Sequence, residues 1–275
     1  MIAALPPEAS QVTPATTLES LRETISASRL SCWLQCRLRF YFRYVLKLAK
    51  PVTPALIVGQ AVHAVLRRWN LARWHGEAAS PEALEQAFQE AWEGSGEVRW
   101  DGKEADSRAQ AQGLWRAYLE TCLLPVNIPP KGVEVSVDAD LRSHGLPVLR
   151  GVLDLVTGDN RIVDYKTSAQ TQTDERLAHN HELQLSAYGV LYRHATGEQE
   201  SGFEIHSLIK TKQPKITRTE LPPMTDRQQS RLFRSIESYV DGLERKDFVP
   251  SPGMGCMGCE FFNECRKWDG EDHHE

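Results

Sequence analysis

The sequence predicts an α/β fold in which helices flank a central mixed β-sheet. The chain has 275 residues and is 41% hydrophobic, so it can bury one substantial core. Apolar residues recur at helical spacing through the first half of the chain, and their period then changes to two, which is typical of strands. The resulting order of helices, three strands, a helix, further strands and a last helix indicates a mixed sheet covered by helices.

The first half of the chain is predicted to be helical after a loose start. Residues 1–24 are rich in Pro, Ala, Ser and Thr and are expected to form a flexible arm. Ser26 or Ser28 can cap a first helix that ends just before Cys36. Further helices are expected over Pro54 to His75, Pro81 to Trp92 and Ser107 to Leu123. The last two of them lie in a predicted helical insert over residues 77–125.

The second half of the chain is predicted to build the sheet. Three successive strands are expected over Gly132 to Leu141, Pro147 to Val156 and Arg161 to Lys166. The elements that follow are a helix from His181 to His194, strands over Gly202 to Lys210 and Pro214 to Leu221, and an amphipathic helix from Thr225 to Arg245. We expect residues 25–275 to form a single domain.

The charge of the chain is unevenly distributed. The net charge is −5, yet no acidic residue occurs between Glu23 and Glu77, where nine residues are basic. A second basic cluster comprises Lys210, Lys212, Lys215 and Arg218. This distribution favours one surface that grips phosphate while the rest keeps the protein soluble. The alternative is an ordinary solvated helix face.

Composition also limits the location of the protein. No apolar run approaches the ~20 residues that a membrane span requires, and the start lacks the basic region of a signal peptide. Six cysteines are too few for a disulfide-rich secreted scaffold of this length. We therefore expect a cytoplasmic protein that does not contact a membrane.

Residues 151–168, GVLDLVTGDNRIVDYKTS, carry three charges inside two apolar runs. Period two places Asp164 and Lys166 on one face of their strand. A three-residue loop over residues 158–160 would set Asp154 directly opposite Asp164, whereas a two-residue turn would point the two acids to opposite faces. The charges belong together only with the three-residue loop, which is the prediction.

Two opposed carboxylates repel unless a positive group lies between them. A divalent cation would solve this, and hard oxygen ligands favour Mg²⁺ or Mn²⁺, which keep waters and accept phosphate oxygens. Lys166 could then orient or deprotonate a metal-bound water and stabilise a pentacovalent phosphate. The alternative is an Asp-Lys-Asp surface network, and these 18 residues do not separate the two readings.

The same motif resembles the catalytic core of the PD-(D/E)XK nuclease superfamily, in particular its RecB-like exonuclease branch. The matching core is Gly151-x-x-Asp154, nine residues, then Asp164-Tyr165-Lys166-Thr167. Gly59-Gln60-Ala61-Val62-His63 is similar to the upstream histidine motif of that branch, and Gln184-x-x-x-Tyr188 to its downstream helix motif. Leu153 stands in place of the proline that names the superfamily, and the acid before the lysine is Asp rather than Glu.

The resemblance implies a restriction-endonuclease-like core and a role for each matching residue. Asp154, Asp164 and His63 would be metal ligands, with the Tyr165 carbonyl as a fourth, and Lys166 would be the catalytic lysine. Taken singly, His63 would be read as a satisfied helix histidine. Supporting or DNA-contacting roles would fall to Gln184 and Tyr188. Glu134, on the preceding strand, could also approach the metal, but we expect it to face solvent.

A cysteine cluster closes the chain. The spacing Cys256-x2-Cys259-x5-Cys265 lies within residues 250–268 amid glycines that let the backbone wrap closely, and Cys36 is the candidate for a fourth ligand. This pattern is similar to RecB-like nucleases of the AddB and CRISPR-associated adaptation types, which implies a structural [4Fe–4S] cluster that joins the N- and C-terminal segments. Zinc is the alternative metal. Cys32, one helical turn before Cys36, is the rival for the fourth ligand, but we expect it, like Cys122, to be an apolar core residue.

The combined features predict a Mg²⁺- or Mn²⁺-dependent DNA nuclease, favouring an exonuclease on single-stranded or end-containing DNA. Arg37 and Arg39 begin a basic and aromatic run, up to Tyr44, that could contact phosphates and stack on bases, although at least half of its aromatic residues must be core. Partners are expected among recombination, DNA-repair or CRISPR adaptation proteins. The alternative is a non-catalytic DNA-binding or scaffold subunit of such a complex.

Overall fold

The computed structural model of the chain describes residues 18–94, 96–125 and 128–270. These residues form two compact units whose segments alternate along the sequence. The first unit contains residues 51–137 and 152–224, and the second contains residues up to 50, residues 138–151 and residues from 225 onward. The single domain predicted over residues 25–275 stays a prediction, because compactness does not test whether a part folds alone.

The first unit is built on a mixed sheet with the order β3, β4, β5, β6. Its strands are β3 (Val148–Val156), β4 (Arg161–Ser168), β5 (Gly202–Ile209) and β6 (Lys215–Leu221), and β2 (Gly132–Ala139) also pairs with β3. β3 pairs antiparallel with β4, β4 parallel with β5, and β5 antiparallel with β6. The mixed sheet predicted from the sequence is therefore confirmed.

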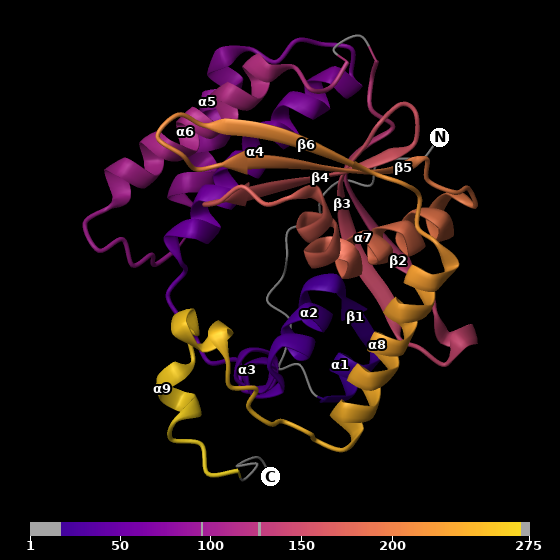
Figure 1. Ribbon diagram of the computed structural model, residues 1–275. Coiled ribbons are helices and arrows are strands. Elements are labelled where there is room, and N and C mark those ends of the chain that lie inside the picture. Colours follow the sequence, from indigo (N-terminus) through magenta and orange to yellow (C-terminus); the bar gives the residue numbers. More distant parts are fainter. Residues whose placement is uncertain (1–17, 95, 126–127, 271–275) are drawn as a thin grey trace. The chain divides into compact units, whose positions relative to one another are not determined.

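Helices cover both faces of this sheet (Figure 1). α4 (Pro54–Trp74), α5 (Pro81–Glu93) and α6 (Glu104–Thr121) pack together on one face, where Val163 and Tyr165 of β4 join their core. α7 (Asp174–Thr196) lies on the other face, toward which Asp164 points. Because side chains alternate along β4, this strand supplies core residues to one face and the candidate site to the other.

Caps explain where the helices of this unit begin. Thr53 and Ser80 each accept a backbone hydrogen bond from the first turn of α4 and α5, and a proline follows each cap. α7 starts at Asp174 rather than near His181, because the Thr173 side chain accepts from Arg176 N–H and two acidic residues occupy the first turn. The sequence prediction missed this cap and so placed the start of α7 two turns late.

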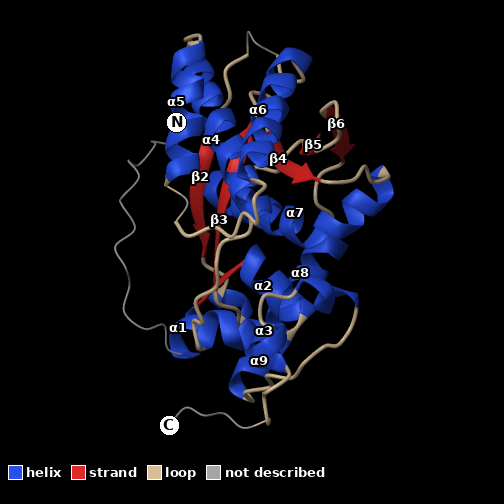
Figure 2. Cartoon of the chain, turned by 90° about the vertical axis from the view of Figure 1, so that its left-hand side faces the viewer, coloured by secondary structure: helices blue, strands red, loops and turns tan. Residues whose placement is uncertain are grey.

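The second unit is mainly helical, with its elements shown in Figure 2. Trp33 lies at its centre, with its ring edge-on to Phe40 and Tyr239 at 5.3 and 5.6 Å. β1 (Thr24–Ser26) pairs in parallel with the first residues of β3. The helical elements are α1 (Leu18–Glu23), α2 (Ala27–Gln35), α3 (Arg37–Phe40), the π-helical turn Tyr41–Val45, the 3-10 turns Arg142–His144 and Met254–Gly258, α8 (Asp226–Glu244) and α9 (Phe262–Cys265).

Two predictions about these elements are wrong. α1 and β1 occupy residues 18–24 of the predicted arm, and Leu21 is buried there because its side chain joins the core of the second unit. Residues 1–17 of that arm lie outside the described residues. Cys122 is exposed rather than core, because the chain leaves α6 there with a left-handed backbone, φ 51°.

Ser26 caps α2 as predicted. Within the described ranges, no helix is long and apolar enough to cross a membrane.

Candidate active site

The register of β3 against β4 places the two aspartates opposite each other. Leu155 pairs with Val163 and Val156 with Ile162, so the same register one step further sets Asp154 against Asp164. Thr157 N–H donates to the Arg161 carbonyl at 2.9 Å, which closes a three-residue loop over residues 158–160. Asn160 takes the left-handed conformation that such a loop needs, φ 69°. The predicted three-residue loop is confirmed.

Asp154 is held beside β4 by a backbone hydrogen bond. Its Oδ2 accepts from Tyr165 N–H at 3.0 Å and lies 3.8 Å from His63 Nδ1. Burial raises the pKa of this carboxyl, the negative charge of Asp164 adds to the rise, and His63 opposes it. The folded protein therefore holds Asp154 in surroundings that disfavour its negative charge.

Asp164 lies at the centre of the site and is 1% exposed. Its Oδ1 accepts from Lys166 Nζ at 2.8 Å, from Gln184 Nε2 at 3.2 Å and from the Tyr188 hydroxyl at 3.5 Å. Its Oδ2 lies 2.7 Å from Lys166 Nζ but accepts no hydrogen bond from any described residue. A buried carboxylate oxygen that is held by the charge of Lys166 alone is a position that a divalent cation could also occupy.

His63 reaches this site from α4. Its Nε2 lies 3.0 Å from the Tyr165 carbonyl oxygen, which can only accept, so Nε2 carries the proton in this hydrogen bond. Nδ1 faces Asp154 Oδ2 at 3.8 Å. The imidazole, the Tyr165 carbonyl and both aspartates are thus brought together, although the sequence separates His63 from Tyr165 by 102 positions.

Gln184 and Tyr188 approach from the opposite face of the sheet. They lie one turn apart on α7, and Gln184 Nε2 donates to the Tyr188 hydroxyl oxygen at 2.6 Å. Burial raises the pKa of Tyr188, and the charge of Asp164 raises it further, so this hydroxyl stays protonated and can donate. Both side chains therefore fix the orientation of the Asp164 carboxylate.

The sequence prediction placed Glu134 wrongly and did not single out Arg67. Glu134, expected to face solvent, is half-buried and pairs with Arg67 at 2.9 Å, so that expectation is wrong. Burial raises the pKa of Glu134, with the charge of Asp154 contributing. Arg67 follows His63 by one turn of α4, a spacing that could have identified it. No comparable signal marks Glu134, because its conformation depends on a positive φ of 44°.

The donor set of the site fits a hard divalent cation. Among residues 18–94, 96–125 and 128–270, no three His, Cys, Asp or Glu side chains already form a metal-binding group. The contacts nevertheless bring suitable donors together: the His63 imidazole lies beside the Tyr165 carbonyl oxygen and Asp154, and Asp154 stands opposite Asp164. These are ligand types that suit Mg²⁺ or Mn²⁺. Lys166 places a positive charge beside Asp164.

The four cysteines of the predicted cluster all lie in the second unit. Burial raises the pKa of the Cys265 thiol, and the charges of Cys36, Cys259 and Cys256 raise it further. They do not form a metal-binding group in the part of the chain that is described. Cys32 is 5% exposed, as expected for a core residue.

The N-terminal basic segment is less available to DNA than its sequence suggests. Acids from residues 247–264 pair with four of its cations: Arg37 with Asp247, Arg39 and Arg43 with Glu260, and Lys50 with Glu264. Arg73 is buried and donates to the Pro125 carbonyl. Phe40, Tyr41 and Phe42 are core residues, which bears out the expectation that at least half of the aromatic residues are buried.

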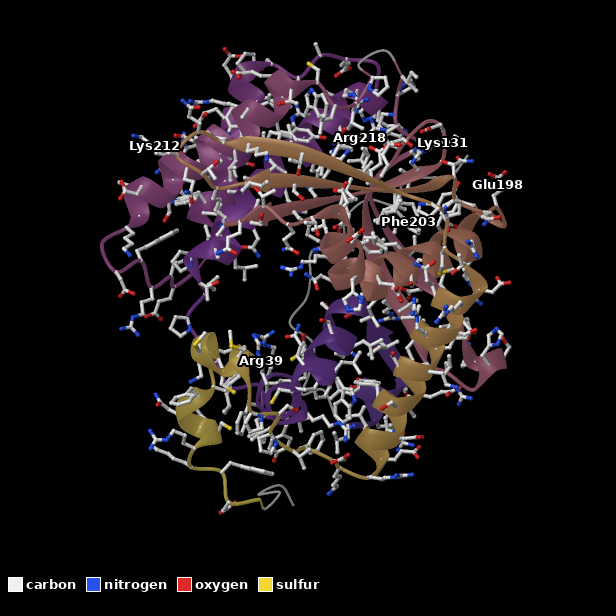
Figure 3. The ribbon with its side chains drawn as sticks, in the orientation of Figure 1. Arg39, Lys131, Glu198, Phe203, Lys212 and Arg218 are labelled. Atoms are coloured by element: carbon white, nitrogen blue, oxygen red, sulfur yellow. The ribbon has the colours of Figure 1, made fainter. Side chains whose placement is uncertain are left out.

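The second basic cluster is divided along the β5–β6 hairpin. Figure 3 places Lys212 at the turn between the two strands and Arg218 farther along β6. The Arg218 guanidinium donates to Glu204 at 2.7 Å, so only the lysines near the turn present unpaired charge among the described residues of this cluster.

Comparisons with known proteins identify the superfamily of the chain. A profile of the PD-(D/E)XK nuclease superfamily matches residues 24–266, and the chain belongs to this superfamily. A crystal structure from Eubacterium rectale, named "Putative exonuclease", is 16% identical, with a TM-score of 0.58 and 97% of each chain covered. The structure of SSO0001 is 14% identical over 84% of this chain and 94% of that one, with a TM-score of 0.38. No curated protein matches the chain. The Eubacterium rectale likeness shows a shared fold.

Proposed function

We propose that the protein is a Mg²⁺- or Mn²⁺-dependent deoxyribonuclease of the RecB-like branch, acting as an exonuclease on single-stranded or end-containing DNA. The observation that carries this proposal is the meeting of Asp154, Asp164, Lys166 and His63 at one end of the β3–β4 hairpin. Membership of the nuclease superfamily supports the reaction class. The name of the Eubacterium rectale structure supports an exonuclease.

The residues around Asp164 have separate parts in this reaction. Asp154, Asp164, His63 and the Tyr165 carbonyl would hold the cation, which supplies Lewis acidity and a water of lowered pKa when it is bound. Lys166 places an ammonium group beside these ligands, where it can orient the attacking water and stabilise negative charge on the phosphate. Gln184 and Tyr188 keep Asp164 in position by donating to its Oδ1.

The cysteines support a second proposal, a structural [4Fe–4S] cluster held by Cys36, Cys256, Cys259 and Cys265. Four neighbouring thiols from segments more than 200 residues apart would tie the ends of the second unit together. Anaerobic purification should give a brown protein with about four irons per chain, whereas a colourless protein with one zinc would establish the alternative metal. Cys259→Ser should lose the metal and destabilise the fold, and a folded, active variant would refute a structural role.

The nuclease proposal is tested with end-labelled single-stranded and double-stranded DNA. In Mg²⁺ or Mn²⁺ the wild-type protein should shorten the linear strands and so reduce the amount of full-length DNA. It should be inactive in EDTA. Asp164→Asn should be inactive in all conditions, because it replaces a metal ligand with an amide of the same shape. Arg116→Gln, an exposed change on α6, is the matched control and should behave as wild type.

The outcomes separate the remaining alternatives. Cleavage of circular single-stranded DNA would show an endonuclease, whereas cleavage of linear strands alone supports an exonuclease. DNA binding without cleavage in either metal would establish a non-catalytic DNA-binding or scaffold subunit. We also propose that the protein is cytoplasmic and that its partners are recombination, DNA-repair or CRISPR adaptation proteins. Co-purification with DNA-processing proteins would support this choice of partners.

A further inference from the structure

A hollow of about 500 Å³ lies beside the candidate site in the first unit. One stripe of α4 forms most of its wall: Ala55, Leu56, Gly59, Gln60, His63, Ala64 and Arg67, which recur at the spacing of a helix face. Glu134 of β2 and Thr167 of β4 complete it. A volume of this size is within the range of cavities that bind small ligands, and His63 connects it directly to the aspartates.

The guanidinium group of Arg67 contributes a positive charge to the lining of this hollow. Its Nε lies 2.9 Å from Glu134 Oε2, and its side chain is 44% exposed. Among the residues that the structure describes, neither Nη1 nor Nη2 of Arg67 has a hydrogen-bond acceptor. The two terminal groups are therefore free to bind a phosphate in the paired geometry that a guanidinium favours, while Nε stays bound to the glutamate.

Glu134 shows signs of a role beyond a surface ion pair. Its φ of 44° is a left-handed conformation that residues with side chains rarely adopt, least of all within a strand. Such backbone strain is most often retained at functional sites. The carboxylate is also half-buried, and it lines the same hollow as His63. The strand thus holds Glu134 where it can fix the Arg67 guanidinium toward the hollow.

We propose that Arg67 binds the DNA phosphate next to the one that is cleaved, and that Glu134 is a positioning residue for Arg67. This inference rests on the proposed nuclease function and adds a substrate contact to it. The protein would then contact the DNA strand at Arg67, one turn of α4 from His63. The exposed Leu56 and Gln60 line the same hollow, where they would meet the adjoining nucleotide.

The test compares Arg67→Gln, Glu134→Gln and the double variant with Arg116→Gln. Arg116 is the matched control, because it pairs with Glu85 at 3.2 Å and is 54% exposed, yet it lies on α6 outside the hollow. Steady-state cleavage of labelled single-stranded DNA in Mg²⁺ gives kcat and KM. Binding to the same DNA is measured at several salt concentrations in an Asp164→Asn background, where no cleavage occurs.

Arg67→Gln should raise KM by about tenfold, the effect of losing one charge-assisted contact, with kcat changed by less than threefold. The salt dependence of binding should fall by about 0.7 in slope, the value for one phosphate contact to a single strand. Glu134→Gln should raise KM by a smaller factor, and the double variant should be no worse than Arg67→Gln alone. All variants should retain the thermal unfolding midpoint of the control within a few degrees.

Three results would overturn the inference. Arg67→Gln could match Arg116→Gln in KM and salt slope, or the effects of the two substitutions could simply add. Glu134→Gln could instead raise the Mg²⁺ concentration needed for cleavage, which would make Glu134 a contact of the cation. Failure of the proposed function is distinguishable, because a wild-type protein that does not cleave DNA still reports the binding affinity and its salt dependence.

Discussion

Replacing Asp154 by asparagine should stabilise the metal-free protein while abolishing its activity. The Cβ atoms of directly opposed residues in an antiparallel pair lie about 5 Å apart. Two unit charges at that distance repel by about 3 kcal/mol at an effective dielectric constant of about 20. Lys166 and His63 offset part of this repulsion, but burial and the charge of Asp164 still raise the Asp154 pKa. The ionised carboxylate therefore destabilises the folded state.

The asparagine removes that charge and keeps the useful contact, because its Oδ1 can still accept from Tyr165 N–H. We expect a gain of about 1 kcal/mol without metal, a typical value for a stabilising substitution at a functional site. For a protein of this size the midpoint of thermal unfolding should rise by about 2–4 °C in EDTA. Saturating Mg²⁺ should reverse the order, since a hundredfold excess over Kd stabilises the wild type alone by about 2.7 kcal/mol.

The raised pKa of Asp154 also determines how the stability difference between Asp154→Asn and the wild type depends on pH. A folded-state pKa raised above the ordinary 3.8 means that the folded protein holds this proton more tightly than the unfolded chain. The destabilisation is absent below the ordinary pKa of 3.8, where the carboxyl is protonated in both the folded and the unfolded state. It develops as the pH rises through the raised pKa of the folded state. The advantage of Asp154→Asn should therefore vanish near pH 3.5 and be complete at neutral pH. A variant that is less stable in EDTA, or that responds to Mg²⁺ as the wild type does, would refute the reasoning.

Three further substitutions test other parts of the account. Lys166→Gln should lower kcat by about 10²–10³-fold in steady-state cleavage, and a loss below tenfold would exclude a direct role for the ammonium group. Tyr118→Phe removes the hydroxyl 2.7 Å from the buried Nδ1 of His206 and should lower the free energy of unfolding by about 1–3 kcal/mol in urea, without changing cleavage by the folded protein. Gly242→Ala would place a Cβ on α8 2.1 Å from the Trp33 ring. It should lower the free energy of unfolding by about 1–3 kcal/mol. An unchanged midpoint in urea would show that the ring can move.

The candidate site was predictable from sequence because its chemistry is local. Asp154 and Asp164 are ten positions apart, so one loop length decides whether they meet, and period two decides that Lys166 shares their face. Strong caps such as Ser26 were also readable from the residues that follow them. Interactions that depend on short spacing and on a single turn are therefore within reach of sequence reasoning.

Errors arose where distant segments decide the outcome. The basic segment looked unopposed because its acidic partners, Asp247, Glu260 and Glu264, lie more than 200 residues away. Glu134 was assigned to solvent because no local pattern reveals a positive φ or a partner on α4. Cys122 was assigned to the core from its residue type alone, whereas the end of α6 exposes it. Tertiary pairing and backbone strain are not encoded in local periodicity.

The most direct test of the central claim is a crystal structure of the protein grown with Mn²⁺ and recorded at a wavelength where manganese scatters anomalously. The account predicts one anomalous peak between Asp154 and Asp164, with carboxylate oxygens of both residues about 2.0–2.2 Å away. The peak should be absent from crystals of Asp164→Asn grown in the same solution. Manganese bound elsewhere, or the two carboxylates turned away from a shared ion, would contradict the account.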